Sequence, residues 1–314
     1  MINIRAHRAV AAAMVCVAAA SLGVFGTPRS KAGTPTPTGA ALTVDSQGWV
    51  HFNDMSGAPV GLVNARTVTV SGQTDVDGSC SLARSGSLST GSAANYSEEV
   101  AVNPTICAEQ DLVGTLTPAG IAALERSSAS QLATTDTPSQ NATANAATPA
   151  GSTQARAFTT SSTAYEKTAY IDPVDLTITS LSVNLTWAHD GSSVPNASYR
   201  IAPYEFKYDG WSNSGTPHPP FVFKAGSVSV QANETFKNSD FEQLLLSVSA
   251  AIPGGPALVF AICGFSLSSA TFKLRNFIQG NASGGYNWSY NDSVGGACSD
   301  LVRHRHWTDY GSSN

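Results

Sequence analysis

The chain has 314 residues, of which only 12% are charged, and its 17 basic and 22 acidic residues give a net charge of −5. An acidic chain without a run of Lys or Arg lacks the charge that holds proteins on nucleic acid or on anionic lipid, which argues against both partners. Its low charge and many small polar and β-branched residues are typical of exported β proteins.

Residues 1–32 have the regions of a Sec-type signal peptide. Arg5 and Arg8 form a basic start, an apolar run from Ala9 to Phe25 follows, and a polar segment ends in Ala32. A retained membrane anchor is the alternative, but a run of about 17 residues is at the lower limit for spanning a bilayer. We therefore predict cleavage after Ala32 and a secreted chain with no membrane attachment, whose 13 basic and 22 acidic residues give a net charge of −9.

Four cysteines remain after this cleavage: Cys80, Cys107, Cys263 and Cys298. An even number in an exported chain indicates two disulfides, for which three pairings are possible. A long polar segment separates the cysteines two and two, so we predict the pairs Cys80–Cys107 and Cys263–Cys298. A zinc site is excluded because no two of these cysteines lie two to four residues apart.

Residues 33–40 are a Pro/Thr-rich tether, and residues 41–126 are predicted to form a small N-terminal module. Its expected strands cover residues 42–44, 49–52, 60–63, 67–70 and 100–102. The Ser/Gly/Thr-rich stretch from Gly78 to Asn95 is predicted to be a loop held by Cys80.

Two short helices are predicted in the same module. Asn103 is a helix-capping residue and Pro104 suits a first helical position, so a short helix is expected from Pro104 to Gly114. Thr117-Pro118 repeats the start signal for a second helix that runs through Glu125.

Residues 127–157 are predicted to be a disordered linker, because they contain few bulky apolar side chains. Residues 158–314 then carry many short strand signals at near-regular spacing. The clearest runs from Leu181 to Ala188, where apolar and polar residues alternate before an Asp190-Gly191 turn. A change of phase just before this run predicts a β-bulge near Thr179.

The remaining strands of this domain are expected at residues 165–171, 199–208, 221–223, 228–236, 244–251, 258–265, 270–278, 286–290 and 301–307. The predicted fold is therefore mainly all-β. It combines a β-sandwich-like C-terminal domain with a small disulfide-linked N-terminal module that contains one or two short helices.

The segment Glu98–Cys107 resembles the E-x-A-x-N-P-x-x-C segment of a group of uncharacterised exported proteins from Gram-positive bacteria. In that group a strand-rich domain follows this segment. Further landmarks of the group are matched at Asp172-Pro173, Leu185-Thr186-Trp187, Asp190-Gly191-Ser192, Trp211, Ala232, Phe236-Lys237-Asn238, Gly280, Gly285, Trp288, Gly296–Leu301 and His304. The resemblance implies an exported two-module protein, and no activity is established for the group.

Candidate catalytic or metal-binding residues have simpler interpretations. His304 and His306 face one side of a strand, as a metal site requires, but no third ligand is near, so half-exposed strand histidines are expected. No G-x-S-x-G motif accompanies His189, Asp190 or His218, which favours turn and loop roles.

Two acidic pairs, Glu205 with Asp209 and Asp172 with Asp175, could serve glycoside hydrolysis, and the second could hold Ca²⁺. Solvated turn residues are the favoured interpretation of both pairs. No cofactor and no catalytic residue is predicted.

Aromatic residues near Gly-rich turns give the strongest indication of function, because their rings can stack on sugars. The candidate ligand-binding residues are Tyr208, Trp211, Tyr286, Trp288 and Tyr290. Core packing is the alternative for these rings.

We therefore predict an exported, non-catalytic extracellular or cell-envelope protein that binds a glycan or another envelope component through its C-terminal domain. The alternative is a secreted, glycosidase-like hydrolase that uses carboxylates. Glycosylation sequons are present at Asn141, Asn184, Asn196, Asn233, Asn281, Asn287 and Asn291.

Overall fold

The computed structural model describes residues 42–52, 61–74, 80–91, 93–132, 140–145, 160–172, 176–206, 210–214, 221–239, 269–296 and 302–313. All of them belong to one compact unit, Pro37–Asn314. The predicted signal peptide and tether lie outside these residues. So do Cys263, Cys298 and the strands expected at residues 244–251 and 258–265.

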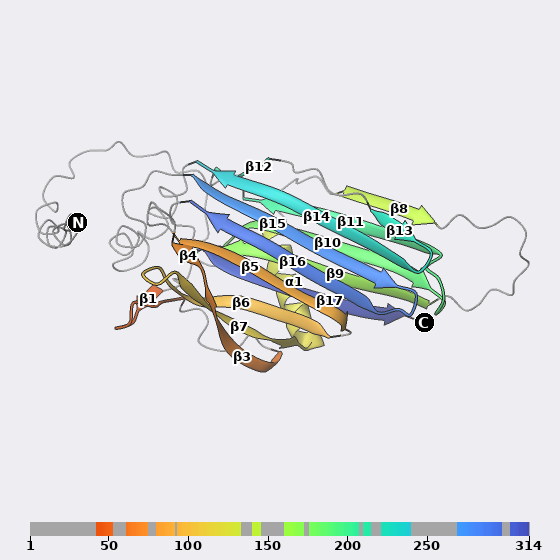
Figure 1. Ribbon diagram of the computed structural model, residues 1–314, viewed down its shortest axis with the longest axis horizontal. Coiled ribbons are helices and arrows are strands. Elements are labelled where there is room, and N and C mark those ends of the chain that lie inside the picture. Colours follow the sequence, from red (N-terminus) through yellow and green to blue (C-terminus); the bar gives the residue numbers. More distant parts are fainter. Residues whose placement is uncertain are drawn as a thin grey trace, which may run out of the picture. The chain divides into compact units, whose positions relative to one another are not determined.

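The described chain is mostly β-strand and forms two antiparallel sheets (Figure 1), which confirms the all-β prediction. The ten-stranded sheet contains β1 (Leu42–Val44), β2 (Val50–Phe52), β3 (Leu62–Ser71), β6 (Ala94–Asn103), β7 (Ala108–Leu116), β8 (Gln140–Asn145), β9 (Thr160–Ile171), β10 (Thr177–His189), β11 (Asn196–Glu205) and β17 (Arg303–Ser313). The seven-stranded sheet contains β4 (Gln73–Thr74), β5 (Cys80–Gly91), β12 (Ser212–Asn213), β13 (Val222–Lys224), β14 (Ser227–Asn238), β15 (Ala270–Asn281) and β16 (Tyr286–Gly295). One helix, α1 (Pro118–Leu132), is present in the described chain.

Strands from residues 41–126 and from residues 158–314 share both sheets. The ten-stranded sheet follows the order β1-β2-β6-β17-β9-β10-β11-β8, with β7 also paired to β6 and β3 to β7. The seven-stranded sheet follows the order β12-β14-β15-β16-β5-β4, with β13 also paired to β14. The pairings β6–β17 and β5–β16 therefore join the two regions that were expected to be separate modules.

The core lies between the two sheets, where β10 packs against β14 and β15. Leu181, Val183, Leu185 and Trp187 of β10 are fully buried, as their alternation with polar residues predicts. The expected bulge is found between Thr177 and Thr179 in the pairing of β10 with β9.

The turn after β10 also has the predicted chemistry. The Asp190 carboxylate accepts hydrogen bonds from the backbone N–H groups of Ser192 and Ser193, and these bonds lower the pKa of Asp190. Gly191 has a φ of 88°, a conformation that favours glycine.

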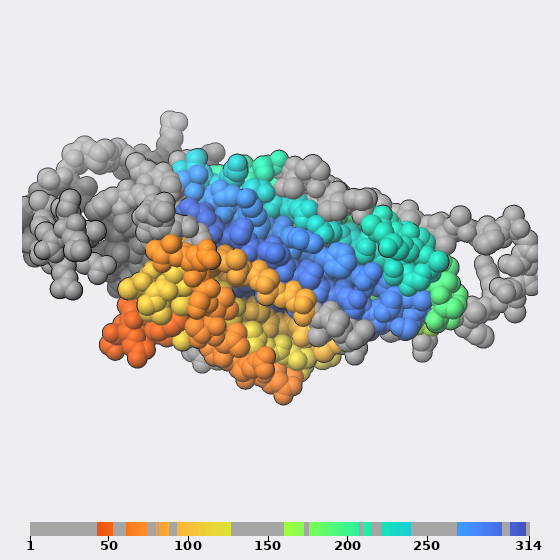
Figure 2. Space-filling model, in the orientation of Figure 1, coloured from red at the N-terminus to blue at the C-terminus, as the bar shows by residue number. Residues whose placement is uncertain are grey.

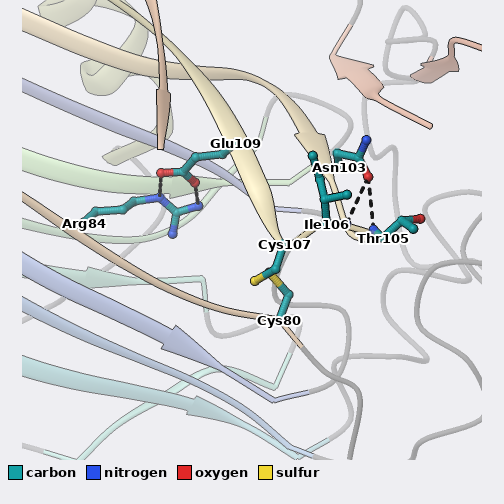
Figure 3. The surroundings of a disulfide bond; sticks show 7 residues. All are labelled: Cys80, Arg84, Asn103, Thr105, Ile106, Cys107 and Glu109. Atoms are coloured by element: carbon teal, nitrogen blue, oxygen red, sulfur yellow. Dashed lines mark hydrogen bonds and ion pairs between the residues drawn. A yellow bond between two sulfur atoms is a disulfide. The ribbon is translucent and has the colours of Figure 1, made fainter. Parts of the chain in front are cut away.

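Two local predictions in the N-terminal region are wrong. The expected loop from Gly78 to Asn95 contains strand β5, because its inward positions Leu82 and Arg84 are buried beneath a Ser-rich outer side. The helix expected from Pro104 to Gly114 is a tight turn followed by β7. Asn103 caps backbone N–H groups as expected, but they belong to Thr105 and Ile106 in this turn (Figure 3).

The second predicted helix is confirmed and is longer than expected. The Thr117 hydroxyl accepts a hydrogen bond from the Gly120 N–H at 3.4 Å, and α1 continues to Leu132. Within the expected linker, the strand β8 pairs with β11, so parts of residues 127–157 carry regular structure.

The Cys80–Cys107 disulfide is confirmed, and it joins the two sheets (Figure 3). Cys80 begins β5 of the seven-stranded sheet, and Cys107 immediately precedes β7 of the ten-stranded sheet. The cross-link therefore holds the start of β5 against the turn between β6 and β7.

Replacing both cysteines, as Cys80→Ser with Cys107→Ser, is expected to lower the free energy of unfolding by about 3.5 kcal/mol. The reason is that the disulfide closes a loop of 27 residues in the unfolded chain. Urea unfolding of the oxidised wild type and the double variant measures the difference. An unchanged free energy of unfolding would contradict the stabilising role of this link.

Gly280 of β15 allows the ring of Trp187 to pack directly on the strand. A Cβ atom at Gly280 would lie 2.5 Å from two ring carbons of Trp187, far inside van der Waals contact. The Trp187 indole N–H also donates to the carbonyl of Asn281 at 3.0 Å, which fixes the position of the ring. This contact joins the strands at the centre of the core.

We expect Gly280→Ala to lower the free energy of unfolding by about 2 kcal/mol, because the fully buried ring must move. Gly295→Ala on the neighbouring β16 is the matched control, since no atom lies within 4 Å of a Cβ there. Equal stabilities of the two variants in urea unfolding would refute the close packing of Trp187 on β15.

Candidate functional site

The aromatic candidates for ligand binding lie in the core rather than on the surface. Trp211, Tyr286, Trp288 and Tyr290 are at most 8% exposed, and all four belong to the main core cluster. Three of them are two residues apart on β16, so the strand period places them on the same side. That side faces the other sheet. Tyr208 lies outside the described residues.

His304 and His306 face the same side of β17 as predicted, but both are buried rather than half-exposed. Each imidazole has a carboxylate partner. His304 Nε2 lies 3.1 Å from Asp292 of β16, and His306 Nε2 lies 3.1 Å from Glu166 of β9. The histidines are hidden because β16 covers this face of β17.

Burial sets the protonation of these two pairs. It lowers the pKa of His304 to about 3 and the pKa of His306 well below its usual value. It also raises the pKa of Asp292 to about 7 and the pKa of Glu166. Both imidazoles are therefore neutral at neutral pH. Among the described residues, no group of three or more His, Cys, Asp or Glu side chains is arranged to hold a metal ion.

A buried ionic cluster links the two sheets near the disulfide. Arg84 of β5 donates from Nε to Glu109 of β7 at 3.0 Å and from Nη2 to Glu99 of β6 at 2.9 Å. Figure 3 shows the bonds between Arg84 and Glu109 beside the Cys80–Cys107 link. All three charged side chains are almost completely buried.

The charges within this cluster depend on one another. Burial opposes the charge on Arg84, but the carboxylates of Glu109 and Glu99 outweigh it and raise the pKa of the guanidinium group. Burial raises the pKa of Glu99, and burial with the neighbouring Glu109 raises the pKa of Asp111 to about 7. Arg84 therefore supplies the positive charge that offsets the repulsion between these buried carboxylates.

A further buried carboxylate, Glu98, belongs to the same region. Glu98 accepts hydrogen bonds from Arg305 at 2.6 and 3.0 Å and from the Tyr96 hydroxyl, and Arg303 lies 3.5 Å away. The only feature of the sequence that could have indicated this cluster is the presence of Glu98 and Glu99 in a segment that forms a strand. Strand alternation alone does not reveal which residues will balance them.

The remaining catalytic candidates have structural roles or lie partly outside the described chain. His189 contacts the Ser162 hydroxyl at 2.9 Å, but Ser162 lies buried within the strand β9 rather than on an exposed turn. Asp172 accepts a hydrogen bond from the Leu176 N–H at 2.8 Å, but its side chain is buried by the surrounding core and is not solvated as predicted. The other candidates, which are the loop histidine His218 and the acidic residues Asp175 and Asp209, are not among the described residues.

The outer face of the seven-stranded sheet presents the outward side chains of four adjacent strands. Figure 2 shows β14, β15, β16 and β5 exposed side by side on this face. We call the outward positions of these four strands the polar face. They are Ser227, Ser229, Gln231, Asn233, Thr235, Lys237, Thr271, Lys273, Arg275, Phe277, Gln279, Asn281, Asn287, Ser289, Asn291, Ser293, Gly295, Ala83, Ser85 and Ser87.

Charge is distributed unequally between the two sides of these four strands. Their acidic residues, Glu234 and Asp292, both point inward and are buried. Three of their basic residues, Lys237, Lys273 and Arg275, point outward and form no ion pair with any described residue. The polar face is therefore cationic although the chain as a whole is acidic.

Two hollows open on or beside the polar face. The larger, of about 610 Å³, lies where β15, β16 and β5 meet the chain between β3 and β4, and Lys273 lines it. The smaller, of about 430 Å³, is lined by Arg275, Asn291 and serines of β5 and β16. Each hollow thus contains one of the outward cations, and neither is lined by a carboxylate.

Comparison with known proteins does not assign this chain to a family. No family model matches it, and neither does any curated protein or solved structure. The resemblance to exported two-module proteins therefore stays a prediction. In the described part of the chain, no helix has the length and apolar character needed to cross a membrane.

Replacing Arg84 with Met is expected to lower the free energy of unfolding by about 3–5 kcal/mol at pH 8, because Glu99 and Glu109 lose their counter-charge. Glu99 is an acid whose pKa is raised in the folded protein. Such a group stabilises the fold at a pH below its pKa in the unfolded chain, and this stabilisation is lost as the pH rises through its pKa in the folded protein. The loss should therefore be smaller at pH 5 than at pH 8.

Arg275→Met is the control, because it removes an exposed arginine from the same sheet and should change stability by less than about 0.5 kcal/mol. Urea unfolding of both variants at the two pH values tests this prediction. A loss for Arg84→Met that is small, or that does not change with pH, would disprove the role assigned to Arg84.

Proposed function

We propose that this chain is an exported, non-catalytic protein that binds a glycan or another cell-envelope polymer on the polar face. The observation that carries the proposal is the composition of that face. Its outward positions are hydroxyl, amide and cationic side chains over four adjacent strands, broken only by Gly295, Ala83 and Phe277.

Hydroxyl and amide side chains suit this role because they both donate and accept hydrogen bonds, as the hydroxyl groups of a sugar do. Several of the amides are already held in place by their neighbours. Gln279 accepts a hydrogen bond from Asn287 at 3.3 Å, and Gln231 donates to Asn233 at 3.0 Å. A rigid sheet that presents oriented polar groups loses little conformational entropy when a polymer binds.

The burial of the side chains that could take part in catalysis favours a binding function. The groups with catalytic chemistry, His304, His306 and the carboxylates around Arg84, are buried and paired with one another. The two hollows of the polar face contain no carboxylate or histidine. The proposal therefore rests on surface recognition and does not depend on the buried aromatic rings.

An extracellular location is part of the proposal. Disulfides persist mainly in oxidising compartments, and Cys80–Cys107 joins the sheet that carries the polar face to the other sheet. The predicted signal peptide and the resemblance to exported proteins agree with this location.

The double variant Gln279→Ala with Asn287→Ala is expected to bind its polysaccharide about tenfold more weakly, because each lost hydrogen bond contributes about 0.5–1.5 kcal/mol. Affinity electrophoresis through gels containing cell-wall or plant polysaccharides measures the binding. The protein should be made in a bacterial host, so that the sequons at Asn233, Asn281, Asn287 and Asn291 on the polar face stay unmodified.

Asn184→Ala is the matched control, because Asn184 is a half-buried residue of β10 in the ten-stranded sheet. It should bind like the wild type. Failure of the wild type to be retained by any of the polysaccharides would refute the proposed function. An equal loss of polysaccharide binding in Asn184→Ala and in the double variant would also refute the assignment of the binding site to the polar face.

A further inference from the structure

Each of the two hollows is lined by residues of β5, β15 and β16, and each contains one cation of β15. Lys273 and Arg275 are two residues apart on β15, so their side chains leave the same side of the strand about 7 Å apart. Across the sheet, Lys273 is opposite Thr235 on one side and Ser293 on the other. Arg275 is opposite Asn233, so the cross-strand neighbours of both cations are hydroxyl or amide groups rather than charges.

Both cations are available for an external anion. Lys273 forms no ion pair within the described chain, and Arg275 donates from Nη2 only to the neutral Gln231 at 3.0 Å. Of the other two cations of these strands, Lys237 also points outward, whereas Arg84 points inward and is neutralised by Glu99 and Glu109. The sheet thus keeps its carboxylates inside and leaves three outward cations without a counter-charge.

This arrangement has a consequence for the choice of ligand. A chain with a net charge of −5 repels an anionic polymer over most of its surface, so such a polymer is attracted to the cationic face. A neutral polysaccharide would accept hydrogen bonds from these cations in place of water but would form no ion pair with them. Arginine matches carboxylate and phosphate groups with paired hydrogen bonds, whereas lysine acts as a point charge.

We propose that the ligand of the polar face is an acidic glycan polymer, which places one carboxylate or phosphate group against Lys273 and another against Arg275. The hollows receive the anionic groups, and the surrounding serines and amides contact the hydroxyl groups of the chain. This inference rests on the proposed function and adds the charge of the ligand to it.

The test compares polymers that differ in charge. Polygalacturonate provides carboxylates, its methyl ester provides the same backbone without charge, and linear polyphosphate provides phosphate without sugar. Binding of the intact protein to each polymer is measured by isothermal titration calorimetry at 50 and 300 mM NaCl.

Polygalacturonate is expected to bind at least tenfold more tightly than its methyl ester, and the difference should shrink at the higher salt concentration. Lys273→Gln and Arg275→Gln should each weaken this binding about threefold, and the double variant about tenfold. Lys224→Gln is the matched control. It removes the same charge from β13 of the same sheet, outside both hollows, and should bind like the wild type.

The possible outcomes separate the two proposals. Equal binding of polygalacturonate and its ester overturns the acidic ligand but leaves a glycan-binding face. Tighter binding of polyphosphate than of polygalacturonate, with the same loss in the variants, supports the anion sites and assigns them to phosphate. Equal losses in Lys224→Gln and in the hollow variants overturn the assignment of the anion sites to Lys273 and Arg275.

Discussion

The pairing of Arg84 with Glu99 and Glu109 is the interaction on which the arrangement of the molecule depends. It is buried, it joins β5 of one sheet to β6 and β7 of the other, and it lies beside the Cys80–Cys107 disulfide. A buried charge without its partner is strongly destabilising, so this cluster permits few alternative registers of β5. The position of β5 in turn extends the polar face beyond β16.

Burial of the carboxylates explains why an acidic chain can present a cationic surface. Glu98, Glu99, Glu109 and Glu166 all lie inside, and each has an arginine or histidine partner there. The outward positions of the seven-stranded sheet are then left to neutral polar groups and to unpaired cations. The proposed recognition of a polymer follows from this separation of charge, whereas the aromatic rings stabilise the core between the sheets.

The sequence predicted the features that depend on local patterns. The alternation in β10, the Asp190-Gly191 turn, the start of α1 at Thr117-Pro118 and the Cys80–Cys107 pair are all confirmed. It did not predict β5, because a Ser/Gly-rich strand lacks the apolar alternation that marks the others. Nor could it place the polar face, because the opposition of Lys273 to Thr235 and Ser293 depends on pairing between strands distant in sequence. The spacing of the rings on β16 indicated one side of the strand but not which side is buried.

The most direct test of this account is to map an acidic polymer onto the protein by nuclear magnetic resonance. Backbone amide shifts are followed while oligogalacturonate is added to the intact, isotope-labelled chain. The account predicts that the largest changes occur on β15 and β16 around Lys273 and Arg275, with no comparable changes on β10 or β11. Changes concentrated on the ten-stranded sheet, or around the buried rings of Trp211 and Trp288, would contradict it.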